Sequence, residues 1–336
     1  MMIPPADHPP IPAPKVGVLL TNLGTPNSPE PGSVKLYLKE FLSDPRVVEI
    51  PQLVWQPILR GIILNTRPKK SAHAYSQVWT EEGSPLAAIT ARQARALQAE
   101  WEGKVIVDHA MRYGKPAIRE RIATLKAQGC ERILLAPLYP QYCAATTATA
   151  NDEAFAYLRG IRWQPAVRTL PPYHDDPAYI AALAERLEEG LAALDFVPDA
   201  ILASFHGMPQ RTLELGDPYH CHCRKTARLL AEATGRELTV TFQSRFGRAK
   251  WLEPATDTTL AALPGQSVKK IAIFAPGFSA DCLETLEELS IRGRETFTEA
   301  GGTHFAYLPC LNDSPAGMKM LRSIIARELE GWVALA

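Results

Sequence analysis

Residues 204–223, SFHGMPQRTLELGDPYHCHC, contain three histidines and two cysteines, side chains that bind metal ions or accept protons. His206 comes first, directly after an apolar run and before Gly207 and Pro209. This order predicts a side chain at the point where a buried strand turns into a loop. The position alone leaves two interpretations open, a hydrogen-bonded structural histidine and a base or metal ligand.

The string His220-Cys221-His222-Cys223 at the end of this stretch looks like half of a zinc site. A structural zinc site usually adds a second pair at C-x₂₋₄-C or H-x₃₋₅-H spacing, and none follows here. The next residues, RKTARLLAEATG, have a helical pattern. We therefore interpret the four residues as incidental to a helix start.

A group of acidic residues occurs in DCLETLEE, residues 281–288. Glu284 and Glu288 are four residues apart, so a helix places them on one face. Glutamates stacked at the carboxyl end of a strand could bind a hard or borderline cation or pass it on. The alternative is a capping box, in which Asp281 caps the helix and Glu284 is its third residue.

Other chemistries lack support in the sequence. The chain has no G-x-G-x-x-G after a strand and no G-x-x-x-x-G-K-[ST], which argues against dinucleotide and P-loop sites. GFSAD, residues 277–281, is an imperfect nucleophile elbow that would need His304 to complete a triad. The 36 basic and 36 acidic residues cancel, and no basic tract indicates nucleic-acid binding.

Apolar runs alternate with helical patterns along the chain, which is typical of parallel α/β layers. The runs are 15–24, 104–114, 132–141, 200–209, 238–247 and 269–278. They pair in order: VLLTNLGTP resembles ILASFHGMP, MRYG resembles SRFG, and LLAPLYPQ resembles AIFAPGFSA. We therefore predict a duplicated unit, giving two similar Rossmann-like domains, each a parallel sheet flanked by helices. His206 falls opposite Leu23 and Glu284 opposite Ala145, so only the second copy carries ionisable groups there.

These patterns predict the domain boundaries. Residues 1–14 form a proline-rich disordered tail, 15–160 the first α/β domain and 161–310 the second. The segment 311–336 is an amphipathic helix that completes the first domain. An insert at about 51–85 contains PQLVWQPILRGIILNTRPKK, residues 51–70, which we call the apolar lip. The lip is either an interrupted core helix or an exposed surface for a flat apolar ligand or a membrane.

The combined motifs resemble ferrochelatase, the enzyme that inserts ferrous iron into protoporphyrin IX. The resemblance extends from about Val16 to Asp313 and is closer to the proteobacterial branch than to the mitochondrial enzyme. The motifs are TNLGTP, FLSDPRVVEIP, VWTEEGSPL, MRYGKP, LYPQY, SFHGMP, GDPY, FQSRFG, WLEPATD and PGFSADCLETLEE. The family fold of two similar α/β domains agrees with the duplication.

The resemblance implies roles for particular residues. The active-site histidine and glutamate of the family match His206 and Glu284, with Glu288 and Asp281 as weaker candidates for moving protons or metal. Some members have histidine where this chain has Cys282, which we expect to pack. The residues that match the porphyrin slot are Leu23, Tyr139, Phe278, Arg112 and Tyr113, with Arg67, Tyr75 and Ser84 as propionate-side contacts.

The resemblance also implies the partners, Fe²⁺ and protoporphyrin IX, and a product, protohaem, of the terminal step of haem biosynthesis. We expect no prosthetic group, and no [2Fe–2S] cluster because no cysteine follows Cys310. Without a secretory signal the cysteines should be reduced thiols, which predicts a cytoplasmic protein with peripheral membrane contact through residues 51–70. The alternatives are a sibling chelatase that uses another metal or coproporphyrin, and a non-enzymatic porphyrin or haem carrier.

Overall fold

The computed structural model describes residues 7, 14–247 and 249–335, and contains two parallel sheets in this part of the chain. The first has the order β2-β1-β3-β4, with β1 (Lys15–Gly24), β2 (Ile106–Tyr113), β3 (Cys130–Pro137) and β4 (Ala166–Thr169). The second has the order β6-β5-β7-β8, with β5 (Ala200–His206), β6 (Thr239–Gln243), β7 (Lys270–Phe274) and β8 (His304–Leu308). The predicted tail, 1–14, lies almost entirely outside the described residues.

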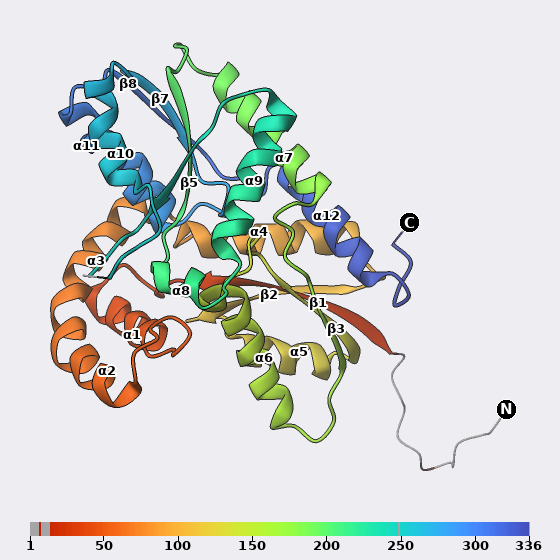
Figure 1. The fold of residues 1–336 in the computed structure, drawn as a ribbon. Coiled ribbons are helices and arrows are strands. Elements are labelled where there is room, and N and C mark those ends of the chain that lie inside the picture. The colour runs from red at the N-terminus through yellow and green to blue at the C-terminus, as the bar shows by residue number, and fades with distance from the viewer. Residues whose placement is uncertain (1–6, 8–13, 248, 336) are drawn as a thin grey trace.

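The two sheets have the same strand order, as expected for a duplicated unit. β1 matches β5, β2 matches β6 and β3 matches β7, which are the three pairs that the sequence motifs predict. Helices flank both sheets (Figure 1), so the predicted fold class of two Rossmann-like domains is confirmed. The fourth strands, β4 and β8, were not predicted, because AVRT and HFAYL are short and lie at the sheet edges.

The central strands are buried on both faces because helices cover them. Val18, Leu19 and Leu20 of β1 are fully buried, and Phe205 of β5 is too. The largest apolar cluster joins the two sheets, since it contains Val18 and Leu20 as well as Phe205. Burial in this shared core fixes the two sheets relative to each other.

The helices that follow β1 lie beside the first sheet, at the lower left of Figure 1, and all but the first belong to the predicted insert at about 51–85. They are α1 (Pro31–Leu42), α2 (Gln52–Ile58), the π-helical segment η1 (Leu59–Ile63) and α3 (Leu64–Val78). Val34, Leu59 and Tyr75 form their own apolar cluster. α4 (Pro85–Glu100) then returns the chain to the first sheet, where it packs against β1 and β2.

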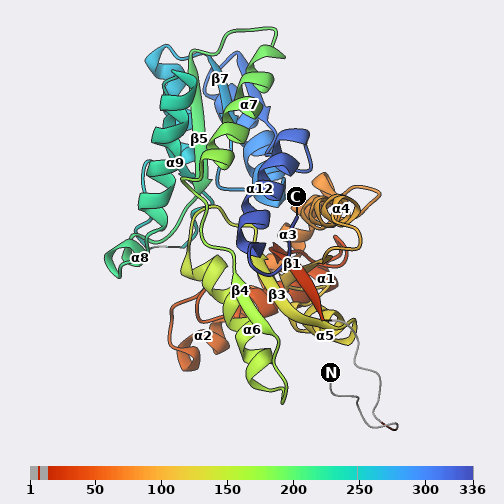
Figure 2. The same cartoon turned by 90° about the vertical axis from the view of Figure 1, so that its right-hand side faces the viewer.

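The remaining helices connect or cover the strands. They are α5 (Ile118–Ala127), η2 (Ala144–Ala148), α6 (Thr149–Arg159), α7 (Pro177–Ala192), α8 (Gln210–Glu214), α9 (Tyr219–Thr234), α10 (Thr256–Ala262), η3 (Leu263–Gln266), η4 (Glu284–Gly293), α11 (Arg294–Glu299) and α12 (Pro315–Leu329). α12 packs against α7 of the second half and against α4 and β3 of the first. Figure 2 shows α12 between the two halves. Within the described residues, no helix has both the length and the apolar content to cross a bilayer.

Candidate active site

His206 is the last residue of β5, at the carboxyl end of the second sheet, where ligands of open α/β sheets bind. It pairs with Gln243, the last residue of β6. The next backbone N–H, that of Gly207, donates to the Gln243 carbonyl at 2.7 Å. A Cβ on Gly207 would lie 2.4 Å from that oxygen, so the close approach requires glycine. The predicted strand-to-loop corner at His206 is confirmed.

The imidazole of His206 has a defined hydrogen-bonding arrangement. Its Nδ1 lies 2.7 Å from the Gly207 carbonyl oxygen. A carbonyl oxygen only accepts, so Nδ1 carries the proton and the neutral ring keeps its lone pair on Nε2. The ring centroid is 6.5 Å from that of Phe278. His206 therefore offers a proton-accepting or metal-binding nitrogen beside an aromatic wall.

Glu284 and Glu288 lie on η4, a π-helix, a type of segment often found at functional sites. Both are partly exposed, and a spacing of four residues keeps them close to one turn apart in this wider helix. Ser244 donates to Glu288 from its backbone nitrogen (2.7 Å) and its hydroxyl (2.6 Å). Burial raises the pKa of Glu288, while the hydrogen bonds from Ser244 and the positive charge of a protonated His206 lower it. Protonation of His206 would therefore favour the ionised form of Glu288.

Asp281 does not form the capping box that was one interpretation of this stretch. η4 begins at Glu284, its N-cap is Leu283, and no side chain caps it. Asp281 is instead buried, with Oδ1 accepting from Thr285 at 3.0 Å and Oδ2 accepting from Asn312 at 2.6 Å. The Tyr307 hydroxyl also donates to Oδ1. Asp281 thus anchors the loop that leads into the helix of the two glutamates.

Two of the predicted porphyrin walls, Leu23 and Phe278, lie together. Both pack against a small apolar cluster that contains Leu86, Ile89 and Cys282. Cys282 is buried there, as expected from the sequence, and burial raises its pKa, with a further contribution from the charge of Glu284. One apolar surface therefore joins the end of β1 to the loop after β7.

Arg112 and Tyr113, two further predicted contacts, are part of a buried polar group. The Arg112 guanidinium donates to Asp44 Oδ2 at 2.6 Å and, through Nε, to the hydroxyl of Thr149 at 2.7 Å. The Tyr113 ring is fully buried, and its hydroxyl donates to Asp44 at 2.9 Å. The side chains of both residues are thus occupied by protein partners.

The other predicted contacts are spread over the first half of the chain. Tyr75 lies on α3, which contacts η4, the helix of Glu284. Burial raises the pKa of Tyr75, and the charge of Glu284 adds to this effect. Arg67 lies over the ring of Phe246, 5.5 Å from its centroid, and burial lowers its pKa. Tyr139 packs on a different cluster, beside the first sheet, and Ser84 is buried at the start of α4.

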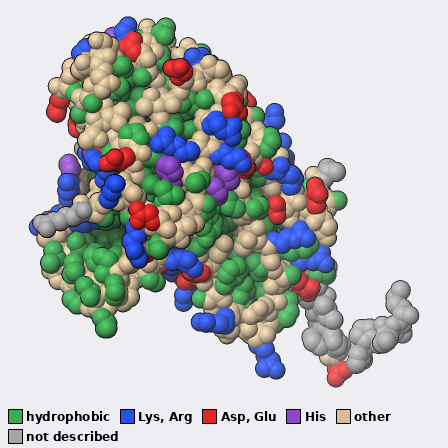
Figure 3. Space-filling model, in the orientation of Figure 1, with side chains coloured by type: hydrophobic (Ala, Val, Ile, Leu, Met, Phe, Trp, Pro, Cys, Tyr) green, Lys and Arg blue, Asp and Glu red, His purple; other side chains and the backbone are tan. Residues whose placement is uncertain are grey.

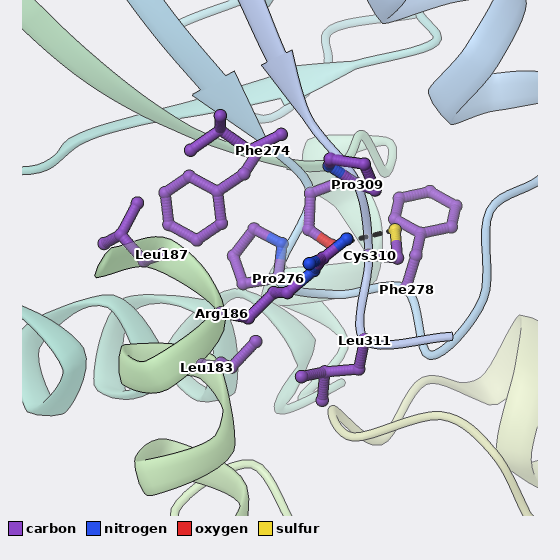
Figure 4. Close-up of a pocket in the computed structure, with 11 residues that line it drawn as sticks. Leu183, Arg186, Leu187, Phe274, Pro276, Phe278, Pro309, Cys310 and Leu311 are labelled. Carbon is purple, nitrogen blue, oxygen red and sulfur yellow. Dashed lines mark hydrogen bonds between the residues drawn. The ribbon is translucent and has the colours of Figure 1, made fainter. Parts of the chain in front are cut away.

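Phe278 also borders a small cavity between α7 and the segments that follow β7 and β8 (Figure 4). Arg186 and Leu187 of α7 and Cys310 contribute to its lining. Its volume, about 10 Å³, is barely enough for one water molecule. This cavity is too small for a macrocycle.

The side chains of His220-Cys221-His222-Cys223, at the start of α9, lie in different environments. Cys223 is buried and Cys221 exposed, while His222 stacks on His174 with ring centroids 3.6 Å apart. Among the described residues no group of three or more His, Cys, Asp and Glu side chains could hold a metal ion. The four residues lie at a helix start, as the sequence pattern predicts.

The serine-hydrolase alternative does not fit the structure. Ser279 follows the carboxyl end of β7, whereas His304 begins the parallel strand β8, opposite Lys270. The two side chains therefore lie at opposite ends of the sheet and cannot share a triad.

Two site residues, Gln243 and Ser244, were not singled out from the sequence. FQSRFG was noted for its likeness to MRYG, not for these side chains. Gln243 donates its side-chain amide to the Glu284 carbonyl at 2.9 Å, and Ser244 holds Glu288. The sequence signal that could have identified them is the polar run Gln243-Ser244-Arg245 at the end of a strand.

Comparison with known proteins identifies the family of the chain. A family model described as Ferrochelatase matches residues 15–329. A protein named Ferrochelatase from Rhizobium meliloti is 55% identical over 335 residues, covering 97% of this chain and 98% of its own. One of the same name from Agrobacterium fabrum is 53% identical over 336 residues, covering 98% of each chain.

Solved structures with little sequence identity share the fold. SirB from Bacillus subtilis with Fe³⁺ has a TM-score of 0.53 at 12% identity, over 95% of this chain and 99% of its own. The sirohydrochlorin chelatase SirB from Bacillus subtilis subspecies spizizenii has a TM-score of 0.52 at 11% identity, over 94% and 97%. Since the family model and the relatives cover nearly the whole sequence, this chain belongs to the ferrochelatase family of metal chelatases.

Proposed function

We propose that this chain inserts ferrous iron into protoporphyrin IX to give protohaem, the terminal step of haem biosynthesis. The observation that carries the proposal is the imidazole of His206 at the carboxyl end of β5, with Nδ1 2.7 Å from the Gly207 carbonyl oxygen, in a chain of the ferrochelatase family. In the reaction, both pyrrole N–H protons leave the ring as Fe²⁺ enters it. The site must therefore accept protons and admit a dication.

His206 is the proposed proton acceptor. Its Nδ1–H bond to the Gly207 carbonyl fixes the ring orientation, and that carbonyl also stabilises the positive charge that follows protonation. Nε2 is the same atom that would ligate ferrous iron, for which imidazole is a suitable donor. Proton removal and metal contact thus share one atom.

Glu284 and Glu288 are the proposed path for protons leaving the site or for iron reaching it. Their carboxylates are hard oxygen donors, and a protonated His206 would favour the ionised form of Glu288. Asp281 is a weaker candidate for direct contact, because Thr285 and Asn312 already donate to its oxygens. Its proposed part is to support the loop before η4.

The macrocycle is proposed to lie against the apolar surface of Leu23 and Phe278. A planar porphyrin hides its nitrogens, so walls that favour a bent ring favour metallation. The further proposed contacts are Tyr139, Arg112 and Tyr113 on the ring side, and Arg67, Tyr75 and Ser84 near the propionates. Cationic and hydroxyl groups suit the propionate carboxylates.

We further propose that the enzyme needs no prosthetic group, with Fe²⁺ as a substrate. The cysteines are free, and in the described chain Cys282 and Cys310 are buried in apolar surroundings rather than arranged for a [2Fe–2S] cluster. The balanced charge and the absence of a basic tract support a reaction without nucleic acid.

We propose a cytoplasmic protein that touches the inner face of the membrane, and the exposed side chains of the apolar lip support the membrane contact. Leu53 of α2 is 93% exposed, and Val54 and Ile62 are 57% exposed each. Apolar side chains gather over the insert at the lower left of Figure 3. Arg60 and Lys69 can supply attraction to anionic headgroups. The predicted domains are 15–160 completed by the helix at 311–336, and 161–310. Because β4 pairs with β3 of the first sheet, we propose that the first domain extends past 160 to the end of β4.

The first experiment is anaerobic insertion of Fe²⁺ into protoporphyrin, followed by porphyrin absorbance, in wild type and His206→Ala. The proposal expects turnover in the wild type and none in a variant that still folds and binds porphyrin. Tight binding without turnover in either protein would indicate a carrier. Parallel assays with coproporphyrin and cobalt separate a sibling chelatase, which would prefer one of them.

A further inference from the structure

Gln243 is 2% exposed and bonds to both halves of the proposed site. Its main-chain carbonyl accepts from the backbone nitrogen of Gly207 at 2.7 Å, directly after His206. Its side-chain Nε2 donates to the main-chain carbonyl of Glu284 at 2.9 Å. One residue therefore connects the corner that carries the imidazole to the first residue of η4.

The orientation of the Gln243 amide is determined by its partners. The Glu284 carbonyl only accepts, so the NH₂ group must face it, and the amide oxygen must face Ser204. The Ser204 hydroxyl donates to that oxygen at 2.8 Å and lies 2.8 Å from the hydroxyl of Thr256. The Thr256 hydroxyl also lies 2.9 Å from that of Thr241.

All four side chains of this network are nearly or completely buried. In such surroundings a satisfied polar network specifies one geometry, because an unpaired member would lose its hydrogen bond without gaining one from water. Glu284 starts a helix whose N-terminus has no side-chain cap. The Gln243 amide is therefore a fixed tether for the end of the helix that carries the glutamate.

We propose that Gln243 is a positioning residue, which sets the position of Glu284 relative to His206 during metal insertion. The inference rests on the proposed function of these two residues. Gln243 acts through the backbone of Glu284 and through the corner at Gly207. A displacement of about 1 Å at a reacting group can cost about 100-fold in rate, so loss of the tether affects turnover more than binding.

The test compares two variants. Gln243→Met removes both side-chain hydrogen bonds of Gln243 and keeps a side chain of similar length. Thr241→Val removes a hydroxyl at the far end of the same network. The readouts are kcat and KM for porphyrin in anaerobic Fe²⁺ insertion, porphyrin Kd from fluorescence, and Tm. We expect Gln243→Met to lower kcat by about 10-fold to 100-fold with porphyrin Kd within about threefold of wild type. Thr241→Val should lower Tm but leave kcat within about twofold.

If Gln243→Met does not fold, Gln243→Asn takes its place, because the shorter side chain keeps an amide in the network but cannot reach the Glu284 carbonyl. A lower kcat than in Thr241→Val, at unchanged Kd, supports the positioning role. Equal kcat in these variants, or losses that only follow Tm, overturns it. Failure of the wild type to insert iron would instead overturn the proposed function, so the two failures are distinguishable.

Discussion

Asp44 and Arg112 form a buried ion pair in which the Arg112 guanidinium donates to Asp44 Oδ2 at 2.6 Å. The hydroxyls of Tyr113 and Thr149 donate to the same oxygen, and the backbone nitrogen of Arg46 donates to Oδ1 at 2.8 Å. Burial opposes ionisation of Asp44, but these hydrogen bonds and the Arg112 charge outweigh it and hold the pKa below its usual value. The group ties the loop after α1 to β2 and α6.

This ion pair predicts a loss of stability in acid. A carboxyl whose folded-state pKa is lowered stabilises the fold above its unfolded pKa, about 3.9, and this contribution is lost as pH falls through the folded value. Asp44→Asn should lower the free energy of unfolding by about 3–5 kcal/mol at pH 7, because Arg112 is left without its counter-charge. The deficit should shrink below about pH 4. Urea unfolding at several pH values measures it.

The matched control is Asp195→Asn, at an exposed aspartate in the loop after α7. It should change the free energy of unfolding by no more than about 0.5 kcal/mol at any of these pH values. If Asp44→Asn shows the same small and pH-independent effect, the pair does not contribute as argued.

Gly207→Ala should damage the His206 corner. The added Cβ would lie 2.4 Å from the Gln243 carbonyl oxygen and 3.3 Å from the Trp251 ring, so backbone must move. We expect a loss of about 1–3 kcal/mol in stability and a fall in kcat of about 10-fold or more, since His206 is adjacent. Chemical unfolding and the iron-insertion assay measure both.

Gly61→Ala is the control for this substitution. Gly61 lies in the helical segment η1 and a Cβ there meets nothing within 4 Å. Alanine should be neutral or stabilise by up to about 1 kcal/mol, because glycine is unfavourable in a helix. If Gly207→Ala behaves like Gly61→Ala, the close approach at Gln243 does not constrain the site.

The position of His206 could be predicted from sequence because its signal is local. A buried apolar run followed by glycine and proline predicts a strand that ends at a corner, and the carboxyl end of a parallel strand is where ligands bind. The likeness of 18–26 to 201–209 predicted equivalent strands, which β1 and β5 confirm. Short-range pattern and internal repetition were enough for this part.

The Gln243–Glu284 bond could not be predicted in this way, because it joins residues 41 positions apart through a side chain. Trp55 shows a related difficulty. It is apolar and lies in the lip sequence, yet its Nε1 donates to the Leu42 carbonyl. Its ring packs against the apolar cluster that contains Leu59 and Tyr75. Which apolar residues of a helix face inward depends on partners from other elements, and sequence composition does not report them.

Cysteine reactivity should differ sharply along the chain. Cys221 is exposed, whereas the remaining cysteines are buried, and burial raises the pKa of Cys130 to about 11. A thiolate is the reactive form, so native protein should react rapidly with a thiol reagent at Cys221 alone. Spectrophotometric thiol titration should detect the others only after denaturation. Cys221→Ser should remove the rapid phase, and its persistence would contradict the burial of the other thiols.

Membrane contact through the lip should depend on Leu53 and Val54 rather than on Trp55. Both side chains are mostly exposed and lie on α2, in which no residue is buried. Inserting one such side chain into the interface contributes about 1.5–3 kcal/mol, so replacing both with glutamine should weaken vesicle binding by at least 10-fold. Co-sedimentation with vesicles of phosphatidylglycerol and phosphatidylethanolamine measures the change.

The control for the lip is Val197→Gln, which replaces an 83% exposed valine in the loop between α7 and β5. If binding came from general surface hydrophobicity, this substitution would weaken it as well. If it comes from the lip, only the Leu53 and Val54 substitutions matter, and raising the salt should weaken wild-type binding because Arg60 and Lys69 meet anionic headgroups. Equal sedimentation of all variants would contradict membrane contact through the lip.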